Sequence, residues 1–288
     1  MGQTIFFTYL SEAAEARSAY RFIISLRRFG GSLKDSPVWV IAASPDTADE
    51  LAFAGVEIFP SEIDLPDYLL SGKVAACAQA EAMAGSDISD LVWVHPGSLF
   101  FNPPDLFNLD LPEPVDAAFR PVHIRNVGLL TSLPLDPFWS AIYQAVGLKD
   151  APYSVESFVD EMVIRPYFNT HIFAVRPDKG LMQAWWSLFQ KMIQDRAFQS
   201  STCKDTLHRL FLHQAILSAL LVMELPEGKL RMLPPTYNYP LELHRQVPSE
   251  KRPERLDDLV CAVYEDSFVF PETLSGLKAS PELAAWFN

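Results

Sequence analysis

Residues 91–101 decide the fold: they read LVWVHPGSLFF, an apolar run that stops at His-Pro-Gly-Ser and then resumes. A short run of β-branched and aromatic residues that ends at Pro-Gly predicts a buried strand followed by a tight turn. In open α/β sheets, ligands bind in the crevice outside the carboxyl ends of the strands. We therefore expect His95, Gly97 and Ser98 to border a ligand site, with an ordinary strand end as the alternative.

The segments before this stretch alternate between strand and helix patterns. Strands are predicted at residues 4–10, 37–42 and 56–59, and helices at 11–29, 46–55 and 67–84. Ser11 is expected to cap the first helix, and the glycines at 30 and 31 are expected to end it. Strands that alternate with helices indicate crossover connections and a mostly parallel sheet covered on both faces.

The second half of the chain adds further elements. Strands are predicted at 116–122, 162–165 and 168–175, helices at 137–146, 181–195 and 205–225, and an irregular wrap from about Thr236 that ends in a short helix near Trp286. No repeat or linker interrupts the sequence, so we expect residues 1–288 to form one domain. The predicted fold is α/β, with a mixed, mostly parallel central sheet flanked by helices in a Rossmann-like three-layer sandwich.

Composition excludes several classes of protein. The chain has 288 residues, of which 49% are hydrophobic, and its net charge is −13. It therefore has ample material for a core but no lysine and arginine footprint for nucleic acid. No apolar run reaches the roughly 18–20 residues of a membrane span, and the three cysteines lack zinc-site or disulfide spacing. With no signal-peptide pattern either, we expect a cytoplasmic protein without a transmembrane segment.

Several segments, taken in order, carry a resemblance to a known family. They are FFTY at 6–9, SLRRFG at 25–30, a helix with Lys73 leading into VWV at 92–94, RPYFNTH at 165–171, LHQ at 212–214 and LPPTYNY at 233–239. Over most of the chain this order resembles the nucleotide-diphospho-sugar transferases, the glycosyltransferases with an A-type fold, near family 8. The resemblance implies transfer of a sugar from a nucleotide-diphosphate donor to an acceptor that the sequence does not identify.

The sequence departs from this family at its metal site. In the family, two carboxylates of an Asp-x-Asp motif hold Mn²⁺ or Mg²⁺, which neutralises the donor diphosphate. Here the two positions are His95 and Gly97, and the family's C-terminal His-Tyr segment is similar to Val263-Tyr264. His171 and His213 stand where the family often has Gly and Asp. The resemblance thus implies that the hard-metal site is lost, and we expect no metal cofactor.

Three interpretations follow from this loss. In the first, transfer continues without a metal, and positive charge comes from protonated His95 or His213 and from Lys73, Arg120, Arg125 and Arg165. In the second, His95, His171 and His213 converge on a softer divalent ion such as zinc or iron. In the third, the protein binds a sugar nucleotide or a glycan without transferring it, or keeps the fold only as a scaffold.

Individual site residues have structural alternatives as well. Thr8 and Tyr9 end the first predicted strand, where they can hold uracil or ribose, or Tyr9 can simply cover the sheet. Asn169 offers a donor and an acceptor for sugar hydroxyls, or it bonds its own backbone in a turn. Gln214, beside His213, contacts the acceptor or the transferred sugar, or the two form a buried structural pair.

These considerations assign two sets of site residues. The predicted catalytic set is His95, Asn169, His213 and Gln214. The predicted substrate-binding set is Thr8, Tyr9, Lys73, Gly97, Ser98, Arg165 and His171.

Overall fold

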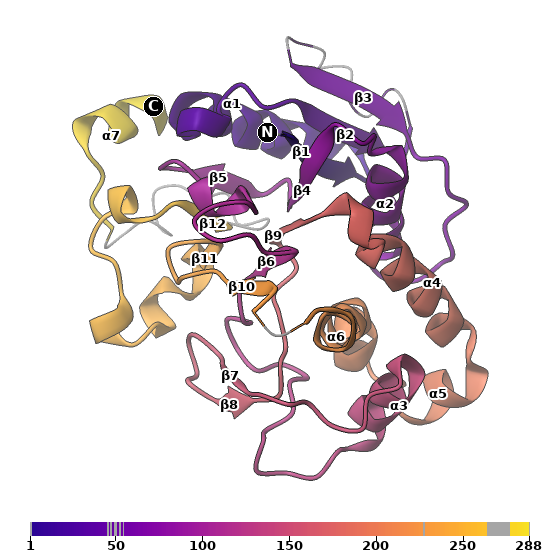
Figure 1. Ribbon diagram of the computed structural model, residues 1–288. Coiled ribbons are helices and arrows are strands. Elements are labelled where there is room, and N and C mark those ends of the chain that lie inside the picture. Colours follow the sequence, from indigo (N-terminus) through magenta and orange to yellow (C-terminus); the bar gives the residue numbers. More distant parts are fainter. Residues whose placement is uncertain are drawn as a thin grey trace.

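A computed structural model gives the fold (Figure 1) and describes residues 2–44, 46, 48, 51, 53, 55–226, 228–263 and 277–287. The helices are α1 (Ala16–Phe29), α2 (Ser71–Met83), α3 (Pro137–Val146), α4 (Leu181–Gln194), α5 (Arg196–Ser201), α6 (Thr206–Glu224) and α7 (Pro281–Phe287). The strands are β1 (Gln3–Leu10), β2 (Val38–Ala42), β3 (Val56–Pro60), β4 (Ile88–Val94), β5 (Ser98–Phe100), β6 (Ala117–Phe119), β7 (Val155–Glu156), β8 (Val163–Ile164), β9 (Ile172–Val175), β10 (Leu230–Met232), β11 (Tyr239–Pro240) and β12 (Cys261–Val263).

Within the described residues, a central sheet of seven strands has the order β10-β6-β9-β4-β1-β2-β3. Every neighbouring pair is parallel except those that involve β9, which runs against both β4 and β6. The predicted α/β fold with a mixed, mostly parallel sheet is therefore confirmed. The chain builds β1, β2 and β3 in one direction and then crosses to β4 on the other side of β1. Such a switch point opens a crevice at the carboxyl ends of the strands.

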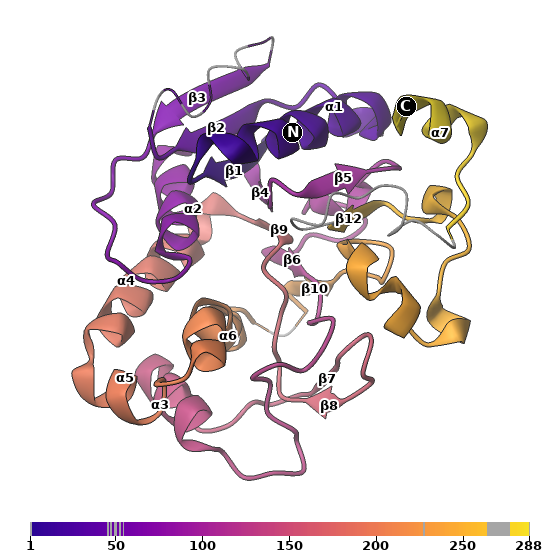
Figure 2. The same ribbon diagram turned by 180° about the vertical axis from the view of Figure 1, so that it is seen from behind.

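Both faces of the sheet are covered, as the apolar strand sequences predict. Along β1, Ile5 and Phe7 pack with the side of the sheet that holds α2, α4 and α6, whereas Phe6 and Leu10 pack with α1 and β5. Figures 1 and 2 show this arrangement from opposite sides, with helices on either side of the sheet. One face of the central sheet is thus covered by helices, and the other face is covered by α1 together with a small second sheet.

That small sheet has the order β11-β12-β5 and occupies part of the predicted irregular wrap. It forms because β5, which resumes the apolar run after the turn at Gly97, leaves the central sheet and pairs antiparallel with β12. The wrap ends in α7, so the predicted short helix near Trp286 is confirmed. The wrap also has a core of its own, to which Phe101, Tyr239 and Leu256 contribute.

Several predicted boundaries were wrong for local reasons. The helix predicted from residue 67 begins at Ser71, because Leu70 adopts a left-handed conformation with φ of 62°. The strands predicted at 116–122, 162–165 and 168–175 are shorter, covering 117–119, 163–164 and 172–175. Ser11 does not cap the first helix; instead the Glu15 carboxylate accepts bonds from the backbone N–H and hydroxyl of Ser11. Much of the helix predicted at 46–55 lies outside the described residues.

Helix α6 has the length and hydropathy of a membrane-spanning helix, alone among the helices in the described ranges, although we expected no such segment. However, 56% of its scored window is buried inside the protein. Leu212, Ile216 and Leu217 are all fully buried in the core beside α2 and α4. The apolar sequence of α6 is therefore accounted for by packing within the fold.

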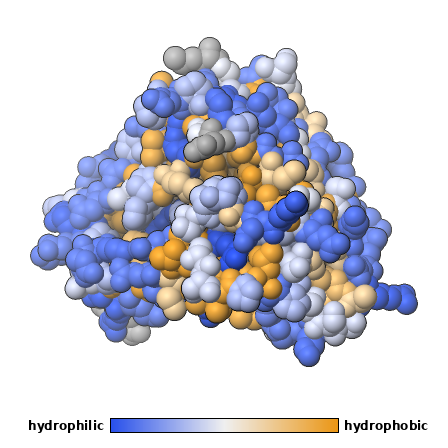
Figure 3. Space-filling view, turned by 60° about the horizontal axis from the view of Figure 1, so that its bottom comes forward, coloured by the Kyte–Doolittle hydropathy of each residue, from blue (hydrophilic) through white to orange (hydrophobic). Residues whose placement is uncertain are grey.

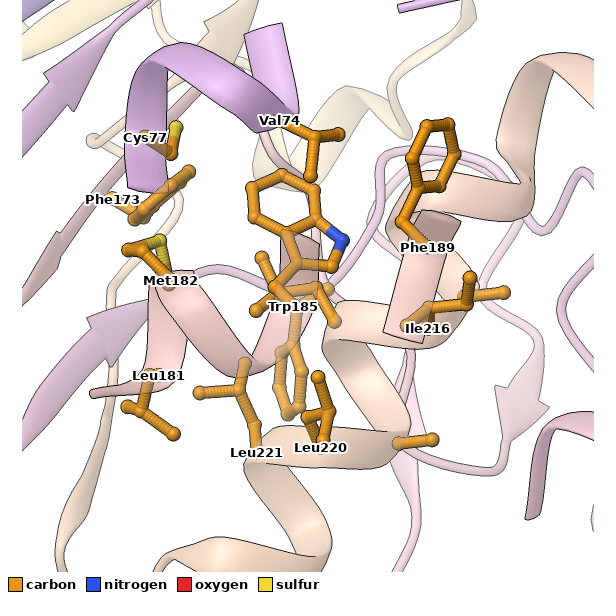
Figure 4. Close-up of a cluster of buried hydrophobic side chains, with 14 of the residues drawn as sticks. Val74, Cys77, Phe173, Leu181, Met182, Trp185, Phe189, Ile216, Leu220 and Leu221 are labelled. Atoms are coloured by element: carbon orange, nitrogen blue, oxygen red, sulfur yellow. The ribbon is translucent and has the colours of Figure 1, made fainter. Parts of the chain in front are cut away.

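Trp185 of α4 lies at the centre of this helical core. Figure 4 shows its indole ring among side chains of α2, α4, α6 and β9. The ring is fully buried, and its Nε1–H donates a hydrogen bond to the backbone oxygen of His213 at 2.7 Å. Trp186, the next residue, is only partly buried. Trp185 therefore connects core packing with the position of α6.

We expect Trp185→Phe to lower the free energy of unfolding by about 2–3 kcal/mol, because it leaves a void and removes the partner of a buried carbonyl. Trp186→Phe, the matched control, should cost less than about 1 kcal/mol. Urea unfolding followed by circular dichroism measures both values. Equal losses in the two variants would contradict this view of the core.

Candidate functional site

A cavity of about 600 Å³ opens at the carboxyl edge of the central sheet. Its walls come from segments that follow β1, β4, β6 and β11, from the residues just before β9, and from α2 and α6. These segments meet because parallel strands end at the same edge, and the antiparallel β9 begins there. The cavity thus lies where the stretch at 91–101 predicted a ligand site. In Figure 3, hydrophobic residues gather toward the middle of one face of the molecule and hydrophilic residues surround them.

His95 and His171 form one wall of the cavity. Because Val94 of β4 pairs with Ile172 of β9, the residues that flank these strands are brought side by side. The backbone N–H of His95 donates to the backbone oxygen of His171 at 2.8 Å, and the two rings meet edge to face at 5.3 Å. The Nδ1 of His95 accepts the backbone N–H of Gly97 at 3.1 Å, so this imidazole carries its proton on Nε2.

Lys73 anchors a hydrogen-bond network on the next wall. Its ammonium group donates to the backbone oxygen of Thr170 at 2.5 Å and to the hydroxyl of Thr170 at 2.8 Å. The same hydroxyl lies 3.1 Å from Nε2 of His213 and 3.3 Å from Oε1 of Gln214. Because Nδ1 of His213 donates to the oxygen of Leu210 at 2.9 Å, Nε2 is left as an acceptor for Thr170. The predicted pair His213 and Gln214 therefore faces the cavity from a fixed position.

Burial controls the charges at this site. It lowers the pKa of Lys73 to about 7, and together with the nearby Lys73 charge it lowers the pKa of His95 to about 3. Burial also holds the pKa values of His123, His171 and His213 well below their ordinary value of 6.5. In the free protein, burial therefore favours the neutral form of these imidazoles at pH 7. That His95 or His213 supplies positive charge beside a bound diphosphate stays a prediction.

The predicted arginines do not reach the cavity. The Arg165 guanidinium pairs with Asp150 at 2.6 Å and also donates to the backbone oxygen of Leu130. Arg120 is buried, donates to the backbone oxygen of Asn238 at 2.7 Å and stacks over the ring of Phe158. Neither residue, nor Arg125, is among those that line the cavity. Among the described residues, Lys73 is the one lysine or arginine side chain in its walls.

Three further predicted residues are also placed elsewhere. Thr8 and Ser98 are fully buried within β1 and β5 and do not line the cavity in the described structure. The ring of Tyr9 covers α2: a Cβ atom at Gly72 would lie 2.5 Å from it. Tyr9 itself belongs to β1 and does not line the cavity, so it packs between the sheet and α2.

The structure brings most of the predicted site residues together. Those that line the cavity are Lys73, His95, Gly97, Asn169, His171, His213 and Gln214. Asn169 uses its side-chain oxygen internally, since Oδ1 accepts from the backbone N–H of His171 and from the side chain of Asn238, each at 2.7 Å. Its predicted turn role is therefore present, and the residue also borders the cavity.

Within the described part of the chain, the cavity residues do not form a metal site. No group of three His, Cys, Asp or Glu side chains among the described residues is arranged to hold an ion. His95 and His171 are neighbours, but the Nε2 of His213 is directed to Thr170. The softer-ion alternative for these three histidines was therefore wrong. Tyr264, compared above with the family's C-terminal ligand segment, lies outside the described residues.

Our sequence analysis missed several wall residues, above all His123. It follows β6, lines the cavity and stacks against His171 with ring centroids 6.4 Å apart. The carboxyl-end rule that we applied to residues 95–98 predicts a site position for His123 equally well, because it follows a predicted strand. Thr170, which lies within the segment 165–171, also lines the cavity, as do Glu15, Asn126 and Glu242, which no local motif marks.

The chain was also compared with known proteins. No known protein family matches it, and no curated protein matches it.

Because burial lowers the pKa values of these imidazoles, we predict that the free energy of unfolding depends steeply on pH. The unfolded chain protonates its histidines below about pH 6.5, while the folded cavity resists protonation, so stability falls as pH falls from 7 to 5. Below about pH 6.5, each such imidazole adds up to about 1.4 kcal/mol per pH unit to this slope. Urea unfolding at several pH values measures the free energy of unfolding, and its slope against pH should be smaller in His171→Asn than in the wild type.

His208→Asn is the control for this experiment, because His208 lies outside the cavity, partly exposed beside Asp205. This variant should keep the steep slope. A wild-type stability that does not change between pH 7 and pH 5 would show that the imidazoles are not held neutral.

Proposed function

We propose that this protein binds a nucleotide-diphosphate sugar in the cavity and transfers the sugar to an acceptor without a hard metal ion. The observation that carries the proposal is the Lys73 amine, fixed by Thr170 at the carboxyl edge of the sheet in a cavity that the hydrogen-bonding side chains of His213 and Gln214 also line. The resemblance of residues 165–171 and 212–214 to the family supports it, because residues 169–171 and 213–214 of these segments border this cavity.

Lys73 is the group suited to the diphosphate. It lies in the first turn of α2, whose N-terminal residues Leu70 and Lys73 both border the cavity, so the helix dipole adds to its charge. A bound anion favours the protonated amine and would raise the pKa of Lys73 from about 7. The ammonium then stabilises charge that develops on the departing diphosphate, which is the role the metal has in the family.

The remaining walls suit the sugar. Neutral imidazoles and side-chain amides both donate and accept hydrogen bonds, as hydroxyl groups do. Apolar side chains such as Leu210, Phe211 and Leu243 complete the walls and exclude water from the bound group. This combination of a few placed polar groups with apolar surface is typical of small-molecule sites.

A second candidate function is binding of the same ligand without transfer. It is favoured by the charge at the site, because Lys73 is the single lysine or arginine among the cavity's described wall residues and the imidazoles are neutral. The negative charge on the departing diphosphate would therefore be compensated less well here than by a divalent metal ion. Turnover distinguishes the two candidates.

The experiment is a thermal-shift screen against UDP-, GDP-, ADP- and dTDP-sugars with EDTA or with Mn²⁺, followed by chromatographic detection of the released nucleoside diphosphate. The proposal predicts stabilisation and slow donor cleavage that EDTA does not abolish. Stabilisation without cleavage would favour the binding protein. Absence of any shift across the screen would overturn both candidates.

Lys73→Met should weaken binding of the stabilising nucleotide sugar by about 30-fold, corresponding to the roughly 2 kcal/mol of a charge-assisted hydrogen bond. The protein should remain folded, since Met has a similar length and removes a buried charge. Lys179→Met is the matched control, because Lys179 pairs with Asp116 at the opposite edge of the sheet. Isothermal titration calorimetry measures the affinities, and equal losses in both variants would refute the role of Lys73.

Binding should also weaken as pH rises. In the free protein Lys73 loses its proton near pH 7, and binding of the diphosphate requires that proton back, so affinity should fall by about tenfold per pH unit above 7. Calorimetry in buffers of different ionisation enthalpy would show the uptake of one proton at pH 8. In Lys73→Met the affinity should be flat over this range, and a pH-dependent affinity there would assign the proton to another group.

A further inference from the structure

His123 is a buried polar residue whose ring makes no hydrogen bond within the part of the chain that the structure describes. It is 7% exposed, and neither of its ring nitrogens has a hydrogen-bond partner in the described structure. Buried polar atoms are nearly always paired, because an unpaired donor or acceptor costs free energy. A buried imidazole with two unpaired nitrogens therefore calls for an explanation.

The position of His123 supplies one. The residue lines the cavity, and its ring is stacked almost parallel to His171, with 12° between the planes. Its backbone is held as well, since its carbonyl oxygen accepts the N–H of Val159 at 2.7 Å. The ring of His171 and the backbone hydrogen bond thus hold His123 in place, while its ring nitrogens remain available to a ligand.

We propose that His123 is a ligand-contact residue that hydrogen-bonds hydroxyl groups of an uncharged sugar; this rests on the proposed function. A neutral imidazole has one N–H donor and one acceptor nitrogen. Hydroxyl groups donate and accept, so two of them on a sugar ring satisfy both nitrogens. A phosphate or carboxylate only accepts and would leave one nitrogen unpaired.

Charge points to the same class of ligand. Burial and the neighbouring Arg120 keep the imidazole neutral, so His123 offers no cation to an anionic sugar. The carboxylate-bearing side chains Glu15 and Glu242 line the same cavity, and the protein has a net charge of −13. The site therefore favours neutral hexoses over uronic acids, whose carboxylate would compete with the diphosphate for Lys73.

The test compares His123→Phe, which keeps a stackable ring but removes both nitrogens, with His123→Asn, which keeps a donor and an acceptor. His208→Phe, outside the cavity, is the control. Because Phe replaces an unpaired polar ring by an apolar one, the melting temperature of ligand-free His123→Phe should be unchanged or higher. A structural role for His123 would instead lower it, which would overturn the proposal.

Binding is measured by calorimetry with UDP-glucose, GDP-mannose and ADP-glucose, with UDP, GDP and ADP, and with UDP-glucuronate. His123→Phe should lose about tenfold or more in affinity for the nucleotide sugar that the wild type binds, and less than about twofold for the corresponding nucleoside diphosphate. His123→Asn should recover part of the loss. Equal affinities of wild type and His123→Phe, or equal binding of UDP-glucose and UDP-glucuronate, would overturn the proposal.

A nucleotide-free arm separates this inference from the proposed function. Imidazole nitrogen resonances of His123, assigned by comparison with His123→Phe, are followed by NMR during titration with glucose, galactose and mannose. If these sugars shift the resonances while no nucleotide ligand binds, the inference stands and the proposed function fails. If neither free sugars nor nucleotide sugars affect them, the inference fails as well.

Discussion

The antiparallel course of β9 is the constraint on which the site depends. Because β9 begins where β4 ends, residues 169–171 enter the carboxyl edge of the sheet beside His95. A parallel strand in this position would carry those residues to the opposite edge. Thr170 would then be unable to hold Lys73, and the cavity would lose the network that connects α2, β9 and α6.

Burial sets the pKa values of the groups in and around this network. The amine of Lys73 and several imidazoles are placed where water is scarce, which lowers the pKa of each of them. Such groups cost stability in the free protein, whereas apolar side chains of the same shape would not. These destabilising groups lie at positions that border the cavity, and such a loss of stability is common at binding sites.

Much of the fold could be predicted from the sequence, because local patterns determine it. The apolar runs of the strands and the proline at position 137 indicate their elements without reference to distant residues. The site was predictable only in part. Arg165 resembles a phosphate ligand in sequence, but its partner Asp150 is a distant residue that no local pattern connects to it. His123, in contrast, could have been predicted as a site residue from the sequence, because it follows a predicted strand just as His95 does.

The pairing of β5 with β12 also makes one wall of the cavity depend on segments that lie far apart in the sequence. Gly97 borders the cavity, and the strand that follows it is paired with residues 261–263. Until these two segments have paired, this wall lacks the partner that fixes it. Ligand binding can therefore contribute to folding only after this long-range contact has formed.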